Sequence, residues 1–365
     1  MHKKKRGECS VEEQLKQWQN SLRRPDLEAR EEAQRQWDSI AKPLGSLGAL
    51  EKLVMDMAAL TGTSRVDISK RAVVVCCADN GVVKEGVTQT GQEVTARMAL
   101  EMVKMNSSVC KMAKTVHADV IPVDLGMVRR VEGVLDRHVM DGTEDIARRP
   151  AMTRNQALEA VAVGVELVKE LKEQGYRLLV SGEMGIGNTT TSSALVAAMM
   201  NLPAETVTGR GAGLSDAGLH RKIWAIERAI TVHRPDPKDP LDVLSKLGGL
   251  DICGMAGLFI GGAIYGVPVI IDGFISAVAA MMAQKLCPGA DIAMLPSHCS
   301  DEPAAKRVLM VLNKYPIIFA NMRLGEGTGG VCLLPLLDMA LAVYGGHSTF
   351  DAVGIDAYRP QGGEK

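Results

Sequence analysis

Residues 178–193 read Leu178-Leu-Val-Ser-Gly-Glu-Met-Gly-Ile-Gly-Asn-Thr-Thr-Thr-Ser-Ser193, an apolar strand that runs into a glycine-rich loop and then into a hydroxyl-rich helix start. Free amides at a helix N-terminus, together with Thr and Ser hydroxyls, form an anion pocket suited to a phosphate. The spacing of Gly182, Gly185 and Gly187 is not GxGxxG, and no Gly-Lys-Ser/Thr follows as in a Walker loop. The alternative is a tight strand-to-helix connection capped by Thr189, without a ligand.

The chain on either side of this loop predicts an α/β fold. From residue 72 onward, short apolar runs alternate with helical stretches, a pattern typical of a mostly parallel sheet with crossover helices. Before it, residues 10–62 read as helices with a turn over 42–51. Six strands are predicted, over residues 72–78, 119–124, 177–181, 267–271, 292–295 and 316–320.

A second glycine-dense loop reads Asn321-Met-Arg-Leu-Gly-Glu-Gly-Thr-Gly-Gly330 and holds one carboxylate, Glu326. Its flanking glycines let the backbone turn sharply and approach a ligand closely. The apolar runs 316–320 and 331–337 predict that Glu326 lies between two buried elements. Burial would raise the pKa of its carboxyl toward neutrality, which suits a general base. The alternative is a carboxylate that only caps a helix.

The segments that follow the predicted strands hold nearly all of the glycine-flanked polar residues. In a parallel sheet the carboxyl ends of the strands meet at one edge, where ligands bind. We therefore expect one ligand site along this edge. The segments are 79–90, 125–126, 182–188, 272–273, 296–300 and 321–330.

A third glycine loop, 209–213, precedes a helix that carries Arg221 and Lys222. A lysine one turn inside such a helix could reach a phosphate as a point charge, whereas the alternative is a solvated basic face. His298, between Ser297 and Cys299, is either a ligand-binding residue or hydrogen-bonded structure.

Composition excludes several classes of protein. With 365 residues and 46% apolar content the chain can bury a large core. Lys plus Arg (42) nearly balances Asp plus Glu (43), and aromatics are only 3%, so no nucleic-acid partner is expected. Residues 252–271 carry no charge, but Gly266-Val-Pro268 breaks the run, which predicts a core helix and a strand rather than a membrane span.

Cysteine and histidine patterns point to a cytoplasmic protein without a metal. The eight cysteines show no CxxC pair and lie mostly in apolar runs, as reduced thiols of a cytosolic protein do. The basic start, 1–6, is not followed by an apolar segment, so a signal peptide is not expected. The seven histidines are scattered without an HExxH motif, and no acid pair follows a predicted strand. We expect a metal-free reaction and no cofactor.

Several of these stretches closely resemble the nicotinate-nucleotide–dimethylbenzimidazole phosphoribosyltransferases of cobalamin lower-ligand synthesis. The resemblance spans residues 42–330. The matching stretches are Lys42-Pro-Leu-Gly-Ser-Leu-Gly48, Ala78-Asp-Asn-Gly-Val82, Glu85-Gly-Val87, Glu183-Met-Gly-Ile-Gly-Asn-Thr-Thr190, Leu244-Ser-Lys-Leu-Gly-Gly249, Asp272-Gly-Phe274, Pro296-Ser-His298 and Met322-Arg-Leu-Gly-Glu-Gly-Thr-Gly329.

The resemblance implies a homodimeric enzyme that moves the phosphoribosyl group of nicotinate mononucleotide to 5,6-dimethylbenzimidazole, giving α-ribazole 5′-phosphate and nicotinate. It implies a Rossmann-like, mostly parallel six-stranded sheet with flanking helices, plus a small helical domain from both chain ends. Residues 1–65 would form that domain, with 335–365 returning to it, and 66–334 would form the α/β catalytic domain.

The resemblance also assigns residues. Glu326 falls on the family's general base. The expected nucleotide- and phosphate-binding residues are Glu183, Gly185, Gly187, Asn188, Thr189, Lys222 and Ser300, and the expected acceptor-binding residues are Thr90, Met98 and Leu324.

This chain departs from well-known members near the acceptor. They have serine and glutamine where Thr90 and Met98 stand here, so Met98 replaces a hydrogen-bonding side chain by an adaptable apolar one. The acceptor could therefore be a purine or a phenolic compound instead. The chain could also be a nucleotide- or corrinoid-binding module without catalysis, or a nicotinamide-dependent oxidoreductase, although it lacks the GxGxxG fingerprint of the latter.

Overall fold

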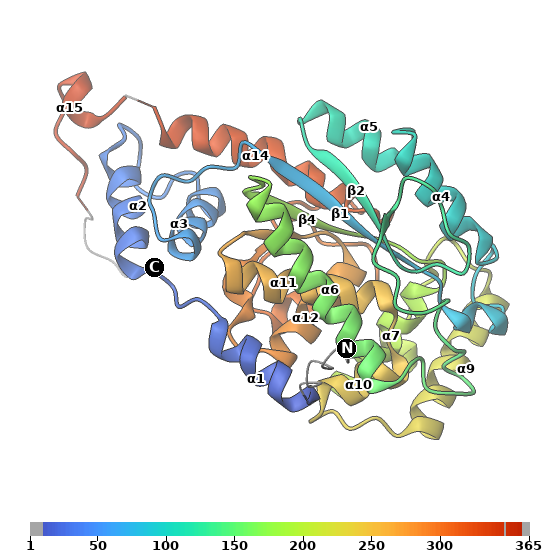
Figure 1. Cartoon of the computed structure of the whole chain (residues 1–365). Helices are drawn as coiled ribbons and strands as arrows, with labels where there is room; N and C mark the ends of the chain where they lie inside the picture. Colours follow the sequence, from blue (N-terminus) through green and yellow to red (C-terminus); the bar gives the residue numbers. More distant parts are fainter. Residues whose placement is uncertain (1–9, 347, 360–365) are drawn as a thin grey trace, which may run out of the picture.

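The computed structural model describes residues 10–346 and 348–359. Its centre is a six-stranded, entirely parallel sheet with strand order β3-β2-β1-β4-β5-β6. Figure 1 labels the central strands β2, β1 and β4 of this sheet. The predicted α/β architecture is therefore confirmed. The strands are β1 (Arg71–Ala78), β2 (Asp119–Gly126), β3 (Leu135–Asp136), β4 (Leu178–Met184), β5 (Val269–Ile271) and β6 (Met294–Pro296).

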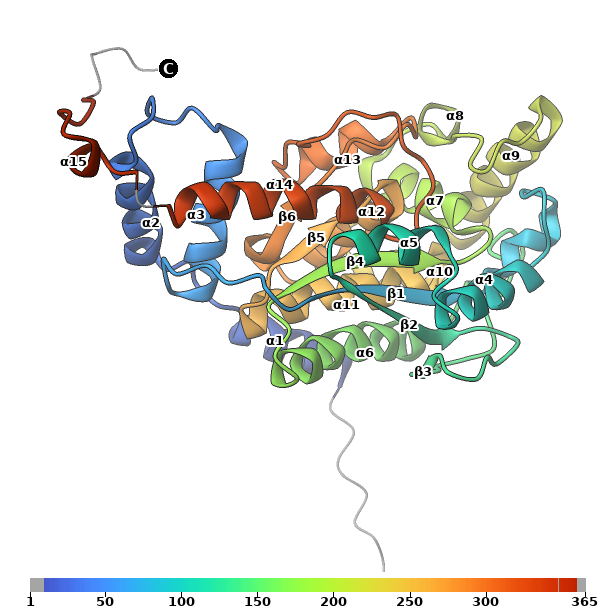
Figure 2. The same cartoon turned by 90° about the horizontal axis from the view of Figure 1, so that it is seen from above.

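Helices cover both faces of the sheet, because both faces of each central strand are apolar. In β1 the side chains of Ala72, Val74 and Cys76 belong to one buried cluster, and those of Val73 and Val75 belong to another. Figure 2 shows α6 and α11 on one side of the sheet and α5 and α14 on the other. The helices are α1 (Val11–Ser21), α2 (Leu27–Ser39), α3 (Ala49–Thr61), α4 (Glu93–Val103), α5 (Ser108–Thr115), α6 (Arg154–Glu173), α7 (Asn188–Met200), α8 (Ala204–Val207), α9 (Asp216–His233), α10 (Pro240–Leu247), α11 (Leu250–Tyr265), α12 (Phe274–Leu286), α13 (Ala305–Val311), α14 (Thr328–Tyr344) and α15 (Phe350–Val353), with 3-10 turns η1 (Gly81–Glu85) and η2 (Ala290–Ala293).

Segments from both ends of the chain meet beside the sheet. Trp37 of α2 packs against Tyr344 of α14 with ring centroids 4.9 Å apart and ring planes tilted by 52°, and the Tyr344 hydroxyl donates to the Ser64 carbonyl. Ile40 and Thr349 form an antiparallel bridge. Figure 1 shows α2, α3 and α15 gathered at this end, whereas α1 packs against α11 through the buried Trp18. The domain boundaries at 65 and 334 stay a prediction.

One predicted strand is wrong. Residues 316–320 form only a single bridge, between Ile318 and His298, and are not part of a strand. The run follows the edge strand β6, and Phe319 is 72% exposed, so its apolar character does not reflect a place in the core. It therefore cannot supply the burial expected on one side of Glu326.

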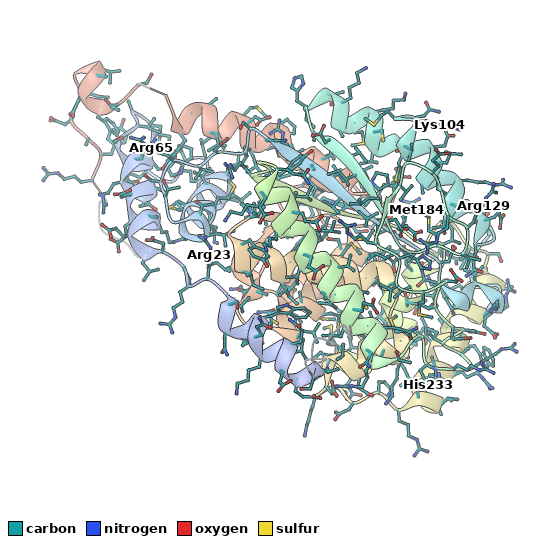
Figure 3. All side chains as sticks on the ribbon, viewed as in Figure 1. Arg23, Arg65, Lys104, Arg129, Met184 and His233 are labelled. Carbon is teal, nitrogen blue, oxygen red and sulfur yellow. The ribbon has the colours of Figure 1, made fainter. Side chains whose placement is uncertain are left out.

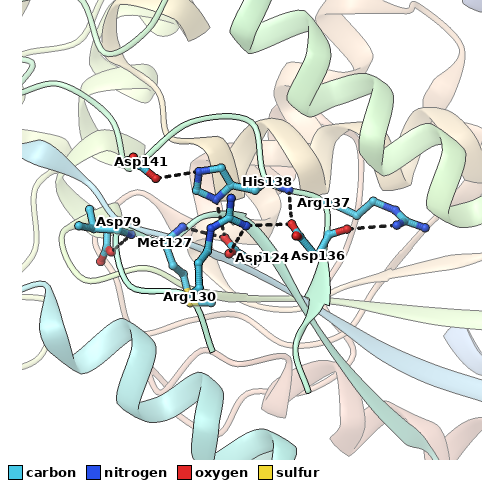
Figure 4. A network of polar contacts seen from close by, with 9 residues as sticks. Asp79, Asp124, Met127, Arg130, Asp136, Arg137, His138 and Asp141 are labelled. Atoms are coloured by element: carbon cyan, nitrogen blue, oxygen red, sulfur yellow. Dashed lines mark hydrogen bonds and ion pairs between the residues drawn. The ribbon is translucent and has the colours of Figure 1, made fainter. Parts of the chain in front are cut away.

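The sequence analysis missed β3, which fills the sixth place in the sheet. Its two residues lie in a polar stretch with no strand pattern. Charged contacts hold the segment in place (Figure 4): Arg130 lies 3.2 Å from Asp124 and 2.9 Å from Asp136, and the His138 ring contacts Asp124 at 3.3 Å. Because these contacts join polar side chains rather than apolar ones, no apolar pattern predicts them.

The uncharged segment 252–271 forms a core helix and a strand, as predicted. Almost all of α11 is buried under the sheet, where it packs on α6. Among the residues that the structure describes, no helix is long and apolar enough to cross a membrane. Glycine makes the packing possible: a Cβ at Gly257 would lie 2.0 Å from the Val161 carbonyl oxygen, and one at Gly164 would lie 2.1 Å from the Gly254 carbonyl oxygen.

Gly257→Ala should therefore destabilise the fold by about 3 kcal/mol, the upper end of the range for overpacked cores, because the clash is with backbone and cannot be relieved by a rotamer change. Urea unfolding measures this loss. Gly345→Ala is the matched control, since its φ is −83° and its new Cβ would have no neighbour nearer than 3.4 Å. An unfolding midpoint unchanged by Gly257→Ala would contradict the packing described.

Candidate active site

A cavity of about 420 Å³ opens at the carboxyl edge of the sheet. The segments after β1, β4, β5 and β6 and the loop before α14 all contribute to its wall, as expected for a parallel sheet. Met184, at the end of β4 and labelled in Figure 3, is part of this wall. Ten of the expected site residues line the cavity: Thr90, Met98, Glu183, Gly185, Gly187, Asn188, Thr189, Ser300, Leu324 and Glu326.

Glu326 stands on a tight turn in which three consecutive residues have a left-handed backbone. Gly325 and Gly327 have φ of 88° and 90°, and Glu326 itself has φ of 61°. A left-handed conformation is costly for a residue with a Cβ, so the surrounding structure must enforce it. The turn places the carboxyl group in the cavity wall, with only 7% of the residue exposed.

The Glu326 carboxyl also faces a helix N-terminus. Its Oε2 accepts a hydrogen bond from the Val109 amide, 3.2 Å away, in the first turn of α5. The pKa of Glu326 is raised, mainly because burial disfavours the charged form; the Val109 amide lowers it and the nearby Asp272 charge raises it. Glu326 thus caps α5 and faces the cavity at once, so the helix-capping alternative and a chemical role are compatible.

Asp272 anchors the Glu326 turn. This buried carboxylate, just after β5, accepts from the Gly330 amide at 2.9 Å through Oδ1 and from the Gly327 amide at 3.3 Å through Oδ2. Both amides belong to the start of α14, whose N-cap glycine offers no side chain of its own. Asp272 therefore replaces the missing cap of α14. Because it binds the Gly327 amide, it also fixes the position of Glu326, the residue before Gly327.

The glycine loop after β4 ends at an uncapped helix start. Gly187 is the N-cap of α7, and no side-chain cap bond is made there. Thr189 is not a cap, which corrects that alternative: its hydroxyl accepts from the Lys222 ammonium at 2.8 Å. In this first turn the Asn188 amide donates to the Gly185 carbonyl at 3.0 Å and the Thr190 amide donates to the Gly187 carbonyl at 2.9 Å. The Thr189 amide and the helix dipole are therefore what this helix start offers to an anion.

Lys222 lies behind the cavity wall. It is completely buried, so the solvated-face alternative is wrong for this residue. Its ammonium donates to Thr189 and to the Gly209 carbonyl at 3.0 Å, which ties the loop 209–213 to α7. Burial lowers the pKa of Lys222 to about 8. Arg221, by contrast, is exposed and donates to the Gly86 carbonyl.

Comparisons with known proteins agree with this geometry. A family model described as phosphoribosyltransferase matches residues 22–355. The nicotinate-nucleotide–dimethylbenzimidazole phosphoribosyltransferase of Acetivibrio thermocellus is 46% identical over 330 residues, which cover 90% of this chain and 94% of that protein. The corresponding protein of Ruminiclostridium cellulolyticum is 42% identical over 343 residues, covering 93% and 97%.

This chain belongs to that family of phosphoribosyltransferases.

A solved structure supports the same assignment. The crystal structure of CobT from Thermus thermophilus superposes with a TM-score of 0.85 at 37% identity, covering 90% of this chain and 99% of that one. A second structure from the same organism, titled as the nicotinate-nucleotide–dimethylbenzimidazole phosphoribosyltransferase, gives 0.84 at 36% identity, covering 91% and 99%. The membership expected from the sequence motifs is thus confirmed.

The phosphoribosyltransferase cavity also holds residues that the sequence analysis did not assign. The sequence could have predicted Asp272 at the site, since it follows a predicted strand, and Arg210, since it lies in the glycine loop 209–213. No sequence pattern predicted Glu302 or Ser108 there. His298 lines the cavity, yet it is buried against the Gly329 backbone, so both of its alternatives stay open. Within residues 10–346 and 348–359, no group of three His, Cys, Asp or Glu side chains could hold a metal ion.

Replacing Asp272 with alanine should destabilise the protein and slow catalysis together. Two buried amides lose their acceptor, at about 1–3 kcal/mol each, and the turn that carries Glu326 is released. Urea unfolding and steady-state turnover measure the two effects. Glu28→Ala, on the exposed face of α2, is the control and should change neither. Full activity in Asp272→Ala would contradict this, since it would show that the turn around Glu326 keeps its conformation without Asp272.

Proposed function

We propose that this chain transfers the phosphoribosyl group of nicotinate mononucleotide to 5,6-dimethylbenzimidazole or a related base, giving α-ribazole 5′-phosphate and nicotinate, with inversion at C1′. The observation that carries the proposal is the cavity at the carboxyl edge of the sheet, in which a glycine-flanked glutamate, a helix start without a side-chain cap and apolar side chains meet. Membership of the phosphoribosyltransferase family supports the substrate class.

The chemistry needs one base. In nicotinate mononucleotide the pyridine nitrogen is already cationic, so the C1′–N bond breaks with its electron pair going to nicotinate, and no acid is required. The acceptor's free ring nitrogen forms the new bond to C1′ from the opposite face. Its other ring nitrogen then carries an acidic proton, which the Glu326 carboxylate removes. A raised pKa makes Glu326 a stronger base than an exposed glutamate.

Other residues of the site would bind the nucleotide. The start of α7, with Gly185, Gly187, Asn188 and Thr189, would bind the nucleotide phosphate, and the buried Lys222 ammonium behind Thr189 would favour the phosphate through its charge. Ser300 lines the same cavity and is assigned to the nucleotide.

The residues assigned to the acceptor are mostly apolar: Met98 and Leu324 line the cavity together with Met184 and Ile186, and Thr90 and Ser108 add hydroxyl groups. Such a wall favours a base with apolar ring substituents over a purine with several polar edges. A competition assay that offers benzimidazoles, adenine and phenol together, with products identified by mass, decides the acceptor. Predominant transfer to adenine would contradict this assignment.

Glu326→Gln should slow nicotinate release by roughly 10² or more, because it removes the base and keeps the shape. In the wild type the rate should fall as the pH drops through the raised pKa of Glu326, since protonation blocks the base, and this acid limb should vanish in the variant. Steady-state nicotinate release across pH measures both. Absence of release with every azole and phenol, despite nucleotide binding, would favour a non-catalytic module.

We assign a homodimer in the cytoplasm. Met310, Tyr315, Phe319 and Leu324 are each more than half exposed, which is unusual for large apolar side chains on one segment, and Leu324 also lines the cavity. An interface would cover them. Sedimentation should show a dimer, and Phe319→Asp should weaken it, whereas Val353→Asp, on the distant α15, should not. A monomer at micromolar concentration would contradict the assignment.

A further inference from the structure

Asp251 is a buried carboxylate that lies outside the cavity. It stands in the first turn of α11 and is fully shielded from solvent. Its Oδ1 accepts from the Ile252 amide at 3.0 Å, and its Oδ2 accepts from the Asn188 side-chain amide at 2.9 Å. Burying a charged carboxylate that only neutral donors bind costs folding free energy, so packing alone does not explain why an aspartate stands here.

Asn188 joins Asp251 to the cavity residue Glu183. The same Nδ2 that donates to Asp251 also donates to Oε2 of Glu183, so its two hydrogens serve two carboxyl groups. This fixes which Glu183 oxygen can carry a proton. Oε2 is occupied as an acceptor, which leaves Oε1, and Oε1 lies against the backbone of Gly325 beside Glu326: a Cβ at Gly325 would be only 2.3 Å from it.

The surroundings of Glu183 are acidic. Burial raises its pKa to about 8; the Asp251 charge is the next largest cause, Asn188 acts in the opposite direction, and Asp272 and Glu326 raise it further. The pKa of Asp251 is raised only to about 6, again by burial, so near neutral pH Asp251 is charged and Glu183 is not. The titratable groups facing Glu183 are the carboxyls of Asp251, Asp272 and Glu326 and the thiols of Cys76 and Cys77 on β1.

Positive charges of the cavity are engaged elsewhere. Among the described residues that line the cavity, Arg210 pairs with Asp216, and Arg323 lies 3.2 Å from Asp301. They therefore do not offset the acidic surroundings of Glu183.

We propose that Asp251 is a positioning residue: the shared Asn188 amide holds it close to Glu183, its charge keeps Glu183 neutral, and the Oε1–H of Glu183 donates a hydrogen bond to the nucleotide. An ionised glutamate would repel the anionic nucleotide, whereas a neutral carboxyl donates to a phosphate or ribose oxygen. The identity of the ligand rests on the proposed function, but the protonation of Glu183 does not.

Infrared spectroscopy of the full-length protein without ligand tests the protonation directly, because the C=O stretch of a protonated carboxyl is separate from that of a carboxylate. We expect such a band at pH 7 in the wild type, absent in Glu183→Gln, with a midpoint near pH 8. Asp251→Asn should lower that midpoint by about one pH unit, since a like charge is removed. Asp124→Asn, a buried strand-end carboxylate on β2, is the matched control and should not move it.

A wild-type midpoint below pH 6 would overturn the proposal, and so would a midpoint that Asp251→Asn leaves unchanged. If Asp251→Asn does not fold, the wild-type midpoint alone tests whether Glu183 is protonated at pH 7. Nicotinate mononucleotide binding, measured by calorimetry from pH 6 to 9, gives a second readout. Affinity should fall through the Glu183 midpoint, and the fall should shift in Asp251→Asn. Lys222 also titrates near pH 8, so the part of the fall that Glu183→Gln retains belongs to the lysine.

A uniform loss of affinity at every pH in Asp251→Asn, with an unmoved infrared midpoint, would reduce Asp251 to a structural residue. Failure of the nucleotide to bind at all, with the infrared result as expected, would count against the proposed substrate and not against the role of Asp251.

Discussion

The pair of hydrogen bonds between the Asp272 carboxylate and the start of α14 is the constraint on which the site depends. It joins the end of β5 to the turn that holds Glu326, so the position of the proposed base is set by the sheet itself. The turn alone would be a poor support, since it includes a left-handed non-glycine residue. A rigid strand end and a helix N-terminus together make that conformation the stable one.

Burying several acids at one edge has an electrostatic consequence. Glu183, Asp251, Asp272 and Glu326 all have raised pKa values, mainly through burial, and each is also bound by amide donors that favour the charged form. The number of backbone amides that stabilise the charged form differs from one carboxyl group to the next. Asp272, with two backbone amides, serves as an anchor; Glu326, with one, remains available to a ligand.

Much of this site was predictable because parallel strands end at a common edge. Glu183 and Asn188 lie in the glycine-flanked segment at the end of β4, so their place at this edge follows from topology. Glu326 was expected there because of the wrong strand 316–320, and its observed position comes from the start of α14. The burial of Lys222 was not predictable, since helical periodicity gives a face but not what covers it. Asp251 lies 63 residues from Asn188, and only the folded chain shows that they touch. The run 316–320 misled because exposed apolar residues resemble a strand in pattern.

The most direct test of the account compares two acceptors at saturation, 5,6-dimethylbenzimidazole and its N-methyl derivative, which has no ring proton to remove. If Glu326 acts by taking that proton, Glu326→Gln should slow transfer to the first by roughly 10² and leave single-turnover transfer to the second nearly unchanged. An equal loss with both acceptors would show that Glu326 does not act as the base.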